Sequence, residues 1–270
     1  MQLKNFKPIT SSQRNLIQLN KSNLNKTSLL KHKIVGVKNK AGRNFRGKIT
    51  SYHKGGGHIK KYRIINFLRN NDSTGIITSI EYDPFRTANI ASVFDFLNQN
   101  YYYIIAAKNL NIGNIIKSGQ NAEPKIGHSL PFFKIPVGSY VHNISTHPHK
   151  KAQLCRAAGT YGQLIEKTTQ YARIKLCSGE HRYVSIQCFA TIGIVSNEHL
   201  FLTTIGKAGR NRWLNKRPIV RGVAMNPIDH PHGGATSGGR SSVTPWGKPT
   251  KNGKTSRSKN KLIIIKTKQL

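Results

Sequence analysis

The sequence predicts a mainly β protein in which small barrels lie between two strongly basic arms. Short runs rich in Ile, Val, Tyr and Thr recur between turn residues through the centre of the 270-residue chain, a spacing typical of small barrels. The chain also carries 44 Lys and Arg residues against 9 Asp and Glu, a formal net charge of +35. Most of this charge lies outside the central region.

The individual elements are expected as follows. Because alternating apolar and β-branched residues indicate strands, we expect strands at 76–82, 101–106, 171–176, 182–187, 189–195 and 200–205. Residues 177–181 form a hairpin turn between two of these strands, and residues 114–129, rich in Gly, Ser, Asn and Pro, form a linker between two barrels. Residues 150–158 are the best candidate for a short helix.

The charge is divided among three regions. Residues 1–70 contain 17 Lys and Arg and no acid, residues 71–204 contain 12 basic and 8 acidic residues, and residues 205–270 contain 15 basic residues and one acid, Asp229. Because the basic regions have little apolar periodicity, we expect residues 1–40 and 205–270 to be unstructured in the free protein and to become ordered on a polyanion. Solvated tails are the alternative, but Arg, Gly, Trp and His are interleaved without repetition.

Nucleic acid is the expected polyanion. No apolar run approaches the roughly 20 residues of a membrane-spanning helix, and the basic residues do not follow amphipathic helices. The three cysteines, Cys155, Cys177 and Cys188, lack zinc-site spacing and are expected to be reduced thiols in strands.

Enzyme motifs are incomplete in this sequence. Gly253-Lys254-Thr255 has Lys248 where a phosphate-binding loop needs Gly. Of two His-Pro-His runs, the one at 147–149 is expected to be a surface loop, and the one at 230–232 an RNA contact in which Asp229 could orient His230. We expect neither a cofactor nor a protein-bound metal, apart from Mg²⁺ carried by RNA.

Several ordered motifs resemble the universal large-subunit ribosomal protein two family of bacterial type. The most specific is VRGVAMNPIDHPHGG at 220–234. The others, in chain order, are GRN (42–44), GKIT (47–50), GGGH (55–58), YRI (62–64), EYDP (81–84), ANI (88–90), IPVG (135–138), VHN (141–143), QL (153–154), RAAGTY (156–161), GKAGR (206–210), RW (212–213) and VTPWG (243–247).

The resemblance implies a fold and a place in the cell. It implies a basic N-terminal arm at 1–35, an OB-like RNA-binding barrel at 36–118, an SH3-like barrel at 119–204 and an extended basic C-terminal arm at 205–270. Members bind large-subunit rRNA near the peptidyl transferase centre beside neighbouring ribosomal proteins, and they support assembly, joining of the small subunit and translation. Catalysis belongs to rRNA, so His230, with Asp229, is expected at most to support peptidyl transfer.

Two segments depart from the family pattern. After Gly234 the expected Gly-Glu-Gly-Arg is replaced by Ala-Thr-Ser-Gly-Gly-Arg at 235–240, and the segment 93–103 is longer and more apolar than usual.

Cations, glycines and aromatic rings define the expected RNA-binding residues. The glycines let backbone approach RNA closely, Arg binds phosphate bidentately, and each Trp either stacks on an unpaired base or caps a barrel. The predicted rRNA-binding residues are Arg43, Arg46, Lys48, Lys54, Gly55, Gly56, Gly57, His58, Lys60, Lys61, Arg63, Arg156, Lys207, Arg210, Arg212, Trp213, Lys216, Arg217, Arg221, Asn226, His230, His232, Arg240 and Trp246.

The composition also suggests a compartment. The chain contains 30 Ile, 29 Lys and 24 Asn, amino acids with AT-rich codons. The first 20 residues contain one Arg and do not resemble an imported presequence. We therefore expect an organelle-encoded mitochondrial protein, with a plastid or an AT-rich bacterium as alternatives. A free nucleic-acid chaperone or an RNA-modifying enzyme would explain the charge less well, because neither accounts for the ordered motifs.

Overall fold

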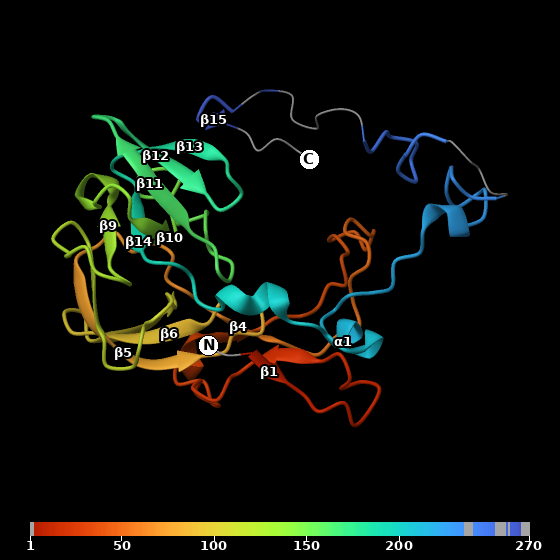
Figure 1. The fold of residues 1–270 in the computed structure, drawn as a ribbon, viewed down its shortest axis with the longest axis horizontal. Helices are drawn as coiled ribbons and strands as arrows, with labels where there is room; N and C mark the ends of the chain where they lie inside the picture. Colours follow the sequence, from red (N-terminus) through yellow and green to blue (C-terminus); the bar gives the residue numbers. More distant parts are fainter. Residues whose placement is uncertain (1–2, 235–239, 252–257, 259, 266–270) are drawn as a thin grey trace. The chain divides into compact units, whose positions relative to one another are not determined.

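A computed structural model describes residues 3–234, 240–251, 258 and 260–265. The chain forms two compact units (Figure 1). Unit 1 comprises Met1–Lys38, Ile59–Lys207 and Lys261–Leu270, and unit 2 comprises Asn39–His58 and Ala208–Asn260. The prediction of a mainly β protein is confirmed, since the described residues contain a single α-helix of six residues.

Unit 1 is built from strands and short 3-10 helices. In chain order its elements are β1 (Leu3–Asn5), β2 (Ile17–Leu19), η1 (Lys31–Lys33), β3 (Ile34–Gly36), β4 (Lys61–Arg63), β5 (Ser73–Glu81), β6 (Ile90–Asp95), β7 (Asn100–Ile105), β8 (Ile115–Ser118), β9 (Ser129–Pro131), η2 (Phe132–Lys134), β10 (Tyr140–His142), β11 (Gly162–Lys167), β12 (Tyr171–Leu176), β13 (His181–Ser185), β14 (Phe189–Ile192), η3 (Glu198–Leu202) and β15 (Ile263–Ile265).

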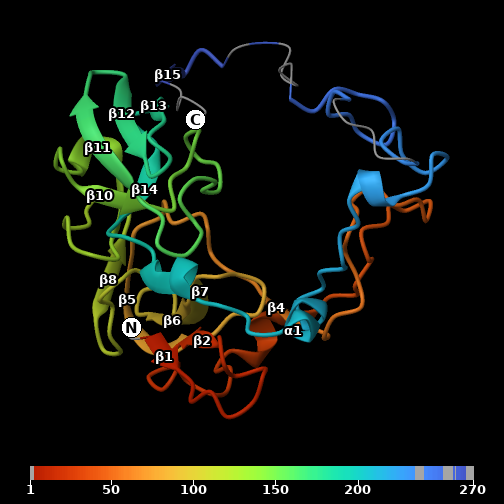
Figure 2. The same ribbon diagram turned by 45° about the vertical axis from the view of Figure 1, so that its right-hand side comes forward.

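The main sheet has 11 strands, in the order β15-β13-β12-β11-β10-β14-β9-β8-β5-β6-β7. Neighbouring strands are antiparallel except β8 and β9, which meet in parallel at Ser118 and Ser129. In Figure 2 the strands β11, β12 and β13 lie side by side, as their ladders require. Burial alternates along β5, so one face of this strand packs on a core and the other does not.

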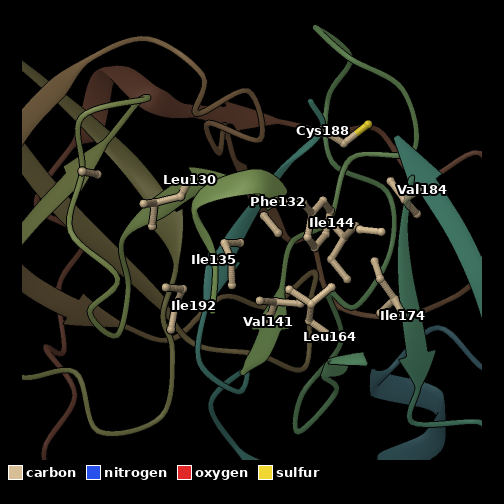
Figure 3. Packing of buried hydrophobic residues seen from close by; sticks show 13 residues of the cluster. Leu130, Phe132, Ile135, Val141, Ile144, Leu164, Ile174, Val184, Cys188 and Ile192 are labelled. Carbon is tan, nitrogen blue, oxygen red and sulfur yellow. The ribbon is translucent and has the colours of Figure 1, made fainter. Parts of the chain in front are cut away.

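Three clusters of buried apolar side chains support unit 1. The largest joins the segments around β9 to β14, and Figure 3 shows Leu130, Phe132 and Ile135 packed with Ile144 and Leu164. The second lies among β5 to β8 and includes Ile77 and Ile104. The third joins β6 and β7, through Ile90 and Tyr103, to side chains from the segments around them, such as Leu30 and Val195. Each fully buried side chain of this size contributes about 1.5–3 kcal/mol relative to an exposed one.

The N-terminal segment is packed rather than free, contrary to the prediction for residues 1–40. Leu16, Leu24 and Leu30 are buried, β1 pairs with β2, and β3 pairs with β4. A buried hydrogen-bond network adds to this packing: the hydroxyl of Tyr103 donates to the carboxylate of Glu81 and accepts from the backbone N–H of Leu30. Burial raises the pKa of Tyr103 to about 12. Isolated leucines at wide spacing have no periodicity that sequence reasoning could detect.

The predicted elements agree with the structure in part. The strand at 171–176 and the turn after it are confirmed as β12 and its hairpin. The strands at 76–82, 101–106, 182–187 and 189–195 are confirmed with shifted ends. The strand at 200–205 is wrong, because η3 occupies Glu198–Leu202. The linker at 114–129 contains β8, which pairs with β5.

The helix predicted at 150–158 is also wrong. Gln153 and Leu154 donate their backbone N–H groups to the carbonyl of Ile144, a pairing that holds this segment extended. All three cysteines are free thiols, but none lies in a strand, and Cys155 has a φ of +52°. The run at 147–149 is a turn with exposed histidines, as predicted.

Candidate nucleic-acid interface

Unit 2 carries most of the predicted RNA-binding residues and is almost uniformly positive. Asp229 is its one acidic residue in sequence. Its predicted members are Arg43, Arg46, Lys48, Lys54, Gly55, Gly56, Gly57, His58, Arg210, Arg212, Trp213, Lys216, Arg217, Arg221, Asn226, His230, His232, Arg240 and Trp246. Lys60, Lys61, Arg63, Arg156 and Lys207 belong to unit 1. The structure thus brings together two segments that are about 150 residues apart in the chain.

The glycine loop of unit 2 (residues 55–57) is hydrogen-bonded to Asn215, which lies just after the end of α1 (Ala208–Trp213). The side-chain oxygen of Asn215 accepts the backbone N–H of Gly57 at 2.6 Å and the side-chain N–H of Asn39 at 2.8 Å. The backbone carbonyl of Asn215 accepts the N–H of Gly55 at 3.0 Å. Asn215 has a φ of +70°, the left-handed conformation that ends helices and that Asn tolerates.

Close packing explains why residue 57 is a glycine, and the backbone conformation explains why residue 56 is one. A Cβ on Gly57 would lie 2.2 Å from the Asn215 side-chain oxygen, and Gly56 has a φ of +69°. Gly55 itself is buried. The backbone of this loop therefore approaches protein at Gly55 and Gly57, whereas Lys54 and His58 beside it are exposed.

The segment after α1 continues along the same loop. Lys216 forms an antiparallel bridge with Lys54, and Arg217 donates its backbone N–H to His53. The Arg212 guanidinium donates to the carbonyl of Lys216 at 3.0 Å, so Arg212 braces the backbone. Lys54, Lys216 and Arg217 remain exposed, which leaves their charges available to phosphate groups.

Both tryptophans are exposed, which favours base stacking over the alternative of capping a barrel. Trp213 is 44% exposed and Trp246 is 66% exposed. The ring of His58 lies 5.8 Å from that of Trp213, centroid to centroid, and the Arg210 guanidinium lies 5.9 Å from the same ring. An exposed indole beside an arginine, as at Trp213, is an arrangement that proteins use for unpaired bases.

The segment 222–234 folds into a compact turn around His230. The Nδ1 atom of His230 accepts the backbone N–H of His232 at 3.0 Å, so the ring carries its proton on Nε2. A Cβ on Gly222 would lie 2.7 Å from this imidazole, and a Cβ on Gly233 would lie 2.2 Å from the carbonyl of Asn226. Small residues at both positions therefore allow the turn to close.

The expectation that Asp229 orients His230 is wrong. His230 is 8% exposed, and the hydrogen-bond partner of its ring is the backbone of His232. Among the described residues the exposed carboxylate of Asp229 has no hydrogen bond or ion pair. His232 in turn bonds to the carbonyl of Ser241 through Nε2. The two rings thus serve the turn, with centroids 4.7 Å apart.

A pocket in unit 1 was missed by sequence reasoning except for Arg156. This open cavity of about 670 Å³ is lined by Tyr62, Phe67, Phe85, Arg86 and Arg156, among others. The Arg156 guanidinium lies 5.0 Å from the Phe67 ring centroid, and Arg86 lies 5.7 Å from the rings of both Tyr62 and Phe67. The rings of Tyr62 and Phe85 meet edge to face at 5.4 Å.

The chemistry of this pocket suits an unpaired nucleotide. Arg86 is held by an ion pair with the buried carboxylate of Asp83, whereas Arg156 is exposed. Cys155 also lines the pocket, and burial raises the pKa of its thiol to about 12, which makes it a weak nucleophile. Each Arg in the pocket stacks on an aromatic ring from a distant segment of the chain. Residues that are neighbours in the sequence therefore give no sign of these pairs.

The described part of the chain contains no group of three or more His, Cys, Asp or Glu side chains able to hold a metal ion. Within the same residues no helix is long and apolar enough to cross a membrane.

Comparison with known proteins places the chain in a family. Residues 30–118 match the model of the RNA-binding N-terminal domain of ribosomal proteins L2, and residues 125–260 match that of the C-terminal domain. Large ribosomal subunit protein uL2 of Rickettsia massiliae (strain Mtu5) is 51% identical over 274 aligned positions, covering 99% of this chain and 100% of the relative. The uL2 proteins of Rickettsia peacockii (strain Rustic) and Rickettsia akari (strain Hartford) are 51% and 50% identical, with the same coverage. The chain therefore belongs to the uL2 family and is a structural protein of the large ribosomal subunit with an RNA-binding N-terminal domain.

Proposed function

We propose that this chain binds large-subunit rRNA near the peptidyl transferase centre through the exposed cations of unit 2 and through the Arg156 pocket. The observation that carries the proposal is that unit 2 brings together two basic segments that share a single acidic residue, Asp229. This concentration of positive charge attracts RNA phosphates, and almost no carboxylate opposes them. Neighbouring ribosomal proteins and the small subunit are further partners.

Sedimentation tests this role directly. The chain is expected to co-migrate with large subunits in high salt. Each phosphate contact weakens as salt rises, but a protein held by many contacts inside an assembled subunit must lose them together before it is released. Its depletion is expected to leave large subunits incompletely assembled and unable to join small subunits. Release at high salt with intact subunits left behind would contradict an assembly role.

In this function His230 is a positioning residue. Its buried ring closes the turn at 222–234, and we assign peptidyl transfer to rRNA. Asn226, His232 and Arg240 serve the same segment: Arg240 donates to the carbonyl of Pro231 at 2.9 Å. The effect of His230 on translation is thus expected to pass through the shape of this turn.

We also infer that the strands of unit 1 form two barrels. β4 to β8 fall within the predicted OB-like barrel at 36–118, β3 begins two residues before it, and β9 to β14 fall within the predicted SH3-like barrel at 119–204. The largest apolar cluster draws on the second range and the other two mainly on the first. An experimental structure of the assembled subunit, in which strand closure is measured, tests these boundaries.

We infer a mitochondrial location from the composition. Codons for Ile, Lys and Asn are AT-rich, and these residues number 30, 29 and 24. The relatives compared above are bacterial, which fits an organelle of bacterial descent and also fits a plastid or a bacterial cytoplasm. Fractionation followed by immunoblotting decides: the chain is expected with mitochondrial large subunits, and its recovery elsewhere would contradict this location.

A further inference from the structure

Residues 42–50, here named loop A, form a small closed hairpin in unit 2. The backbone N–H of Asn44 donates to the carbonyl of Lys48 at 2.9 Å, and the N–H of Gly47 donates back to Asn44 at 3.1 Å. The side-chain oxygen of Asn44 accepts the N–H of Lys48 at 3.0 Å. The loop is closed by the N–H and the hydroxyl of Thr50, both of which donate to the carbonyl of Gly42.

Residues 242–250, here named loop B, have the same pattern. The backbone N–H of Thr244 donates to the carbonyl of Lys248 at 2.8 Å, and the N–H of Gly247 donates back to Thr244 at 2.9 Å. The hydroxyl of Thr244 accepts the N–H of Lys248 at 3.1 Å. The N–H and the hydroxyl of Thr250 both donate to the carbonyl of Ser242.

The two loops therefore share one geometry at corresponding positions. Each has an antiparallel bridge one residue outside the turn, Arg43 with Ile49 and Val243 with Pro249. Gly47 and Gly247 both have a φ of +76° and open space where a Cβ would lie. The short sequences Asn-Phe-Arg-Gly-Lys and Thr-Pro-Trp-Gly-Lys share only their last two residues, which is why the repeat is not evident from sequence.

Each loop presents an aromatic ring at its tip and a lysine after its glycine. Phe45 is 89% exposed and Trp246 is 66% exposed, and both lysines are exposed. The Arg46 guanidinium lies 5.2 Å from the Phe45 ring, and the ring of Tyr52 lies 5.7 Å from that of Trp246. Single exposed aromatic residues are common on proteins, but here each of two matching loops has one at its tip. The two rings are at neighbouring positions of the turn, since Phe45 is the residue after Asn44 and Trp246 is the second residue after Thr244.

We propose that loops A and B are two copies of one RNA-binding element, each of which stacks an unpaired base on its aromatic ring and binds the adjacent phosphate with its lysine. This inference rests on the proposed function and specifies its ligand as single-stranded RNA. The internal hydrogen bonds hold the backbone of each loop in shape before RNA arrives, so little backbone ordering entropy is lost on binding. Stacking on an aromatic side chain tolerates every base, which suits two loops of different sequence.

Binding of the full-length chain to a short oligouridylate and to an RNA duplex tests the proposal. Phe45→Ala and Trp246→Ala are each expected to weaken oligouridylate binding by roughly 5- to 100-fold, since one stacked base is lost, and to leave duplex binding unchanged. Lys48→Ala and Lys248→Ala are each expected to flatten the salt dependence on the oligouridylate by about 0.7 in log–log slope. Phe201→Ala, which removes a ring 81% exposed outside both loops, is the matched control and is expected to have no effect.

Exchanging the loops tests whether they are equivalent. A chain in which residues 244–248 carry the loop A sequence, or residues 44–48 the loop B sequence, is expected to retain oligouridylate binding. Asn44→Thr is expected to be tolerated, because Thr244 performs the same role, whereas Asn44→Ala is expected to weaken binding. Thermal unfolding of every variant confirms that the chain is folded.

The outcomes separate this inference from the proposed function. Full oligouridylate affinity in both Phe45→Ala and Trp246→Ala would overturn the inference and leave rRNA binding intact. An equal loss on duplex and oligouridylate, or an effect from one loop alone, would overturn it too. Failure of the unmodified chain to bind either RNA would instead remove the proposed function itself.

Discussion

Replacement of Asn215 tests whether the glycine loop is held in shape before RNA binds. Asn215→Ala removes the acceptor of two hydrogen bonds, from Gly57 and Asn39, each contributing about 1 kcal/mol. Ala in a left-handed conformation costs roughly a further 1 kcal/mol. The total, about 3 kcal/mol, corresponds to a loss of roughly 100-fold in affinity if RNA must reorder the loop.

The assay is the salt dependence of binding between the full-length chain and its large-subunit rRNA. Asn215 carries no charge, so Asn215→Ala is expected to lower affinity at every salt concentration and to leave the log–log slope unchanged. Asn215→Gly, which tolerates the left-handed conformation, is expected to lose about 2 kcal/mol. The matched control is Lys216→Ala at the next residue, which is exposed and is expected to reduce the slope by about 0.9 on duplex RNA.

The reasoning is refuted if Asn215→Ala binds as the unmodified chain does. It is also refuted if this variant changes the slope as much as Lys216→Ala, because the loss would then be electrostatic rather than a loss of preorganisation.

Other substitutions test the pocket, the core and the His230 turn. Arg156→Gln is expected to weaken rRNA binding and reduce the log–log slope by about 0.7, and an unchanged slope in filter binding would contradict a phosphate contact there. Tyr103→Phe leaves the Glu81 carboxylate and a buried backbone amide each short of one partner, so urea unfolding is expected to show a loss of about 3 kcal/mol; a loss below about 0.5 kcal/mol would be inconsistent. Because the folded-state pKa of Tyr103 is raised to about 12, its contribution to stability is full below pH 10 and is lost as pH rises through 12; Tyr103→Phe is expected to flatten the measured stability over this range. His230→Gln subunits are expected to assemble and to form peptide bonds within about tenfold of the normal rate, whereas His230→Ala subunits are expected to assemble less well. If peptidyl transfer were a thousandfold slower in fully assembled His230→Gln subunits, direct proton transfer by His230 would be the better explanation.

The sequence was sufficient to predict the parts of the fold that depend on local patterns. β12 at Tyr171–Leu176 was predicted with its bounds because apolar and polar residues alternate there between clear turn signals. The segment at 150–158 looked helical by composition, but Gln153 and Leu154 pair with Ile144. Such a pairing is set by tertiary contacts, which override local propensity.

In the candidate site, too, the features set by local sequence could be predicted and those set by tertiary contacts could not. Charge identified the cations of unit 2, since their chemistry depends on residue type alone. Three features depend on residues distant in sequence. They are the hydrogen bonds of Asn215 to the glycine loop, the pocket lining that includes Tyr62 and Phe67, and the match between loops A and B. Their spatial relation follows from the folded chain, so composition and spacing could not reveal them.

Crosslinking of the chain to rRNA within assembled large subunits, followed by identification of the crosslinked peptides, tests the central claim most directly. The claim predicts crosslinks in loop A, loop B, the glycine loop and the Arg156 pocket. The segment 88–107 contains no Lys or Arg and exposes Phe96 and Leu97 at the β6–β7 turn, so it is predicted to remain free of RNA and serves as the internal control. Crosslinks concentrated in 88–107, with none in unit 2, would contradict the assignment of the RNA interface.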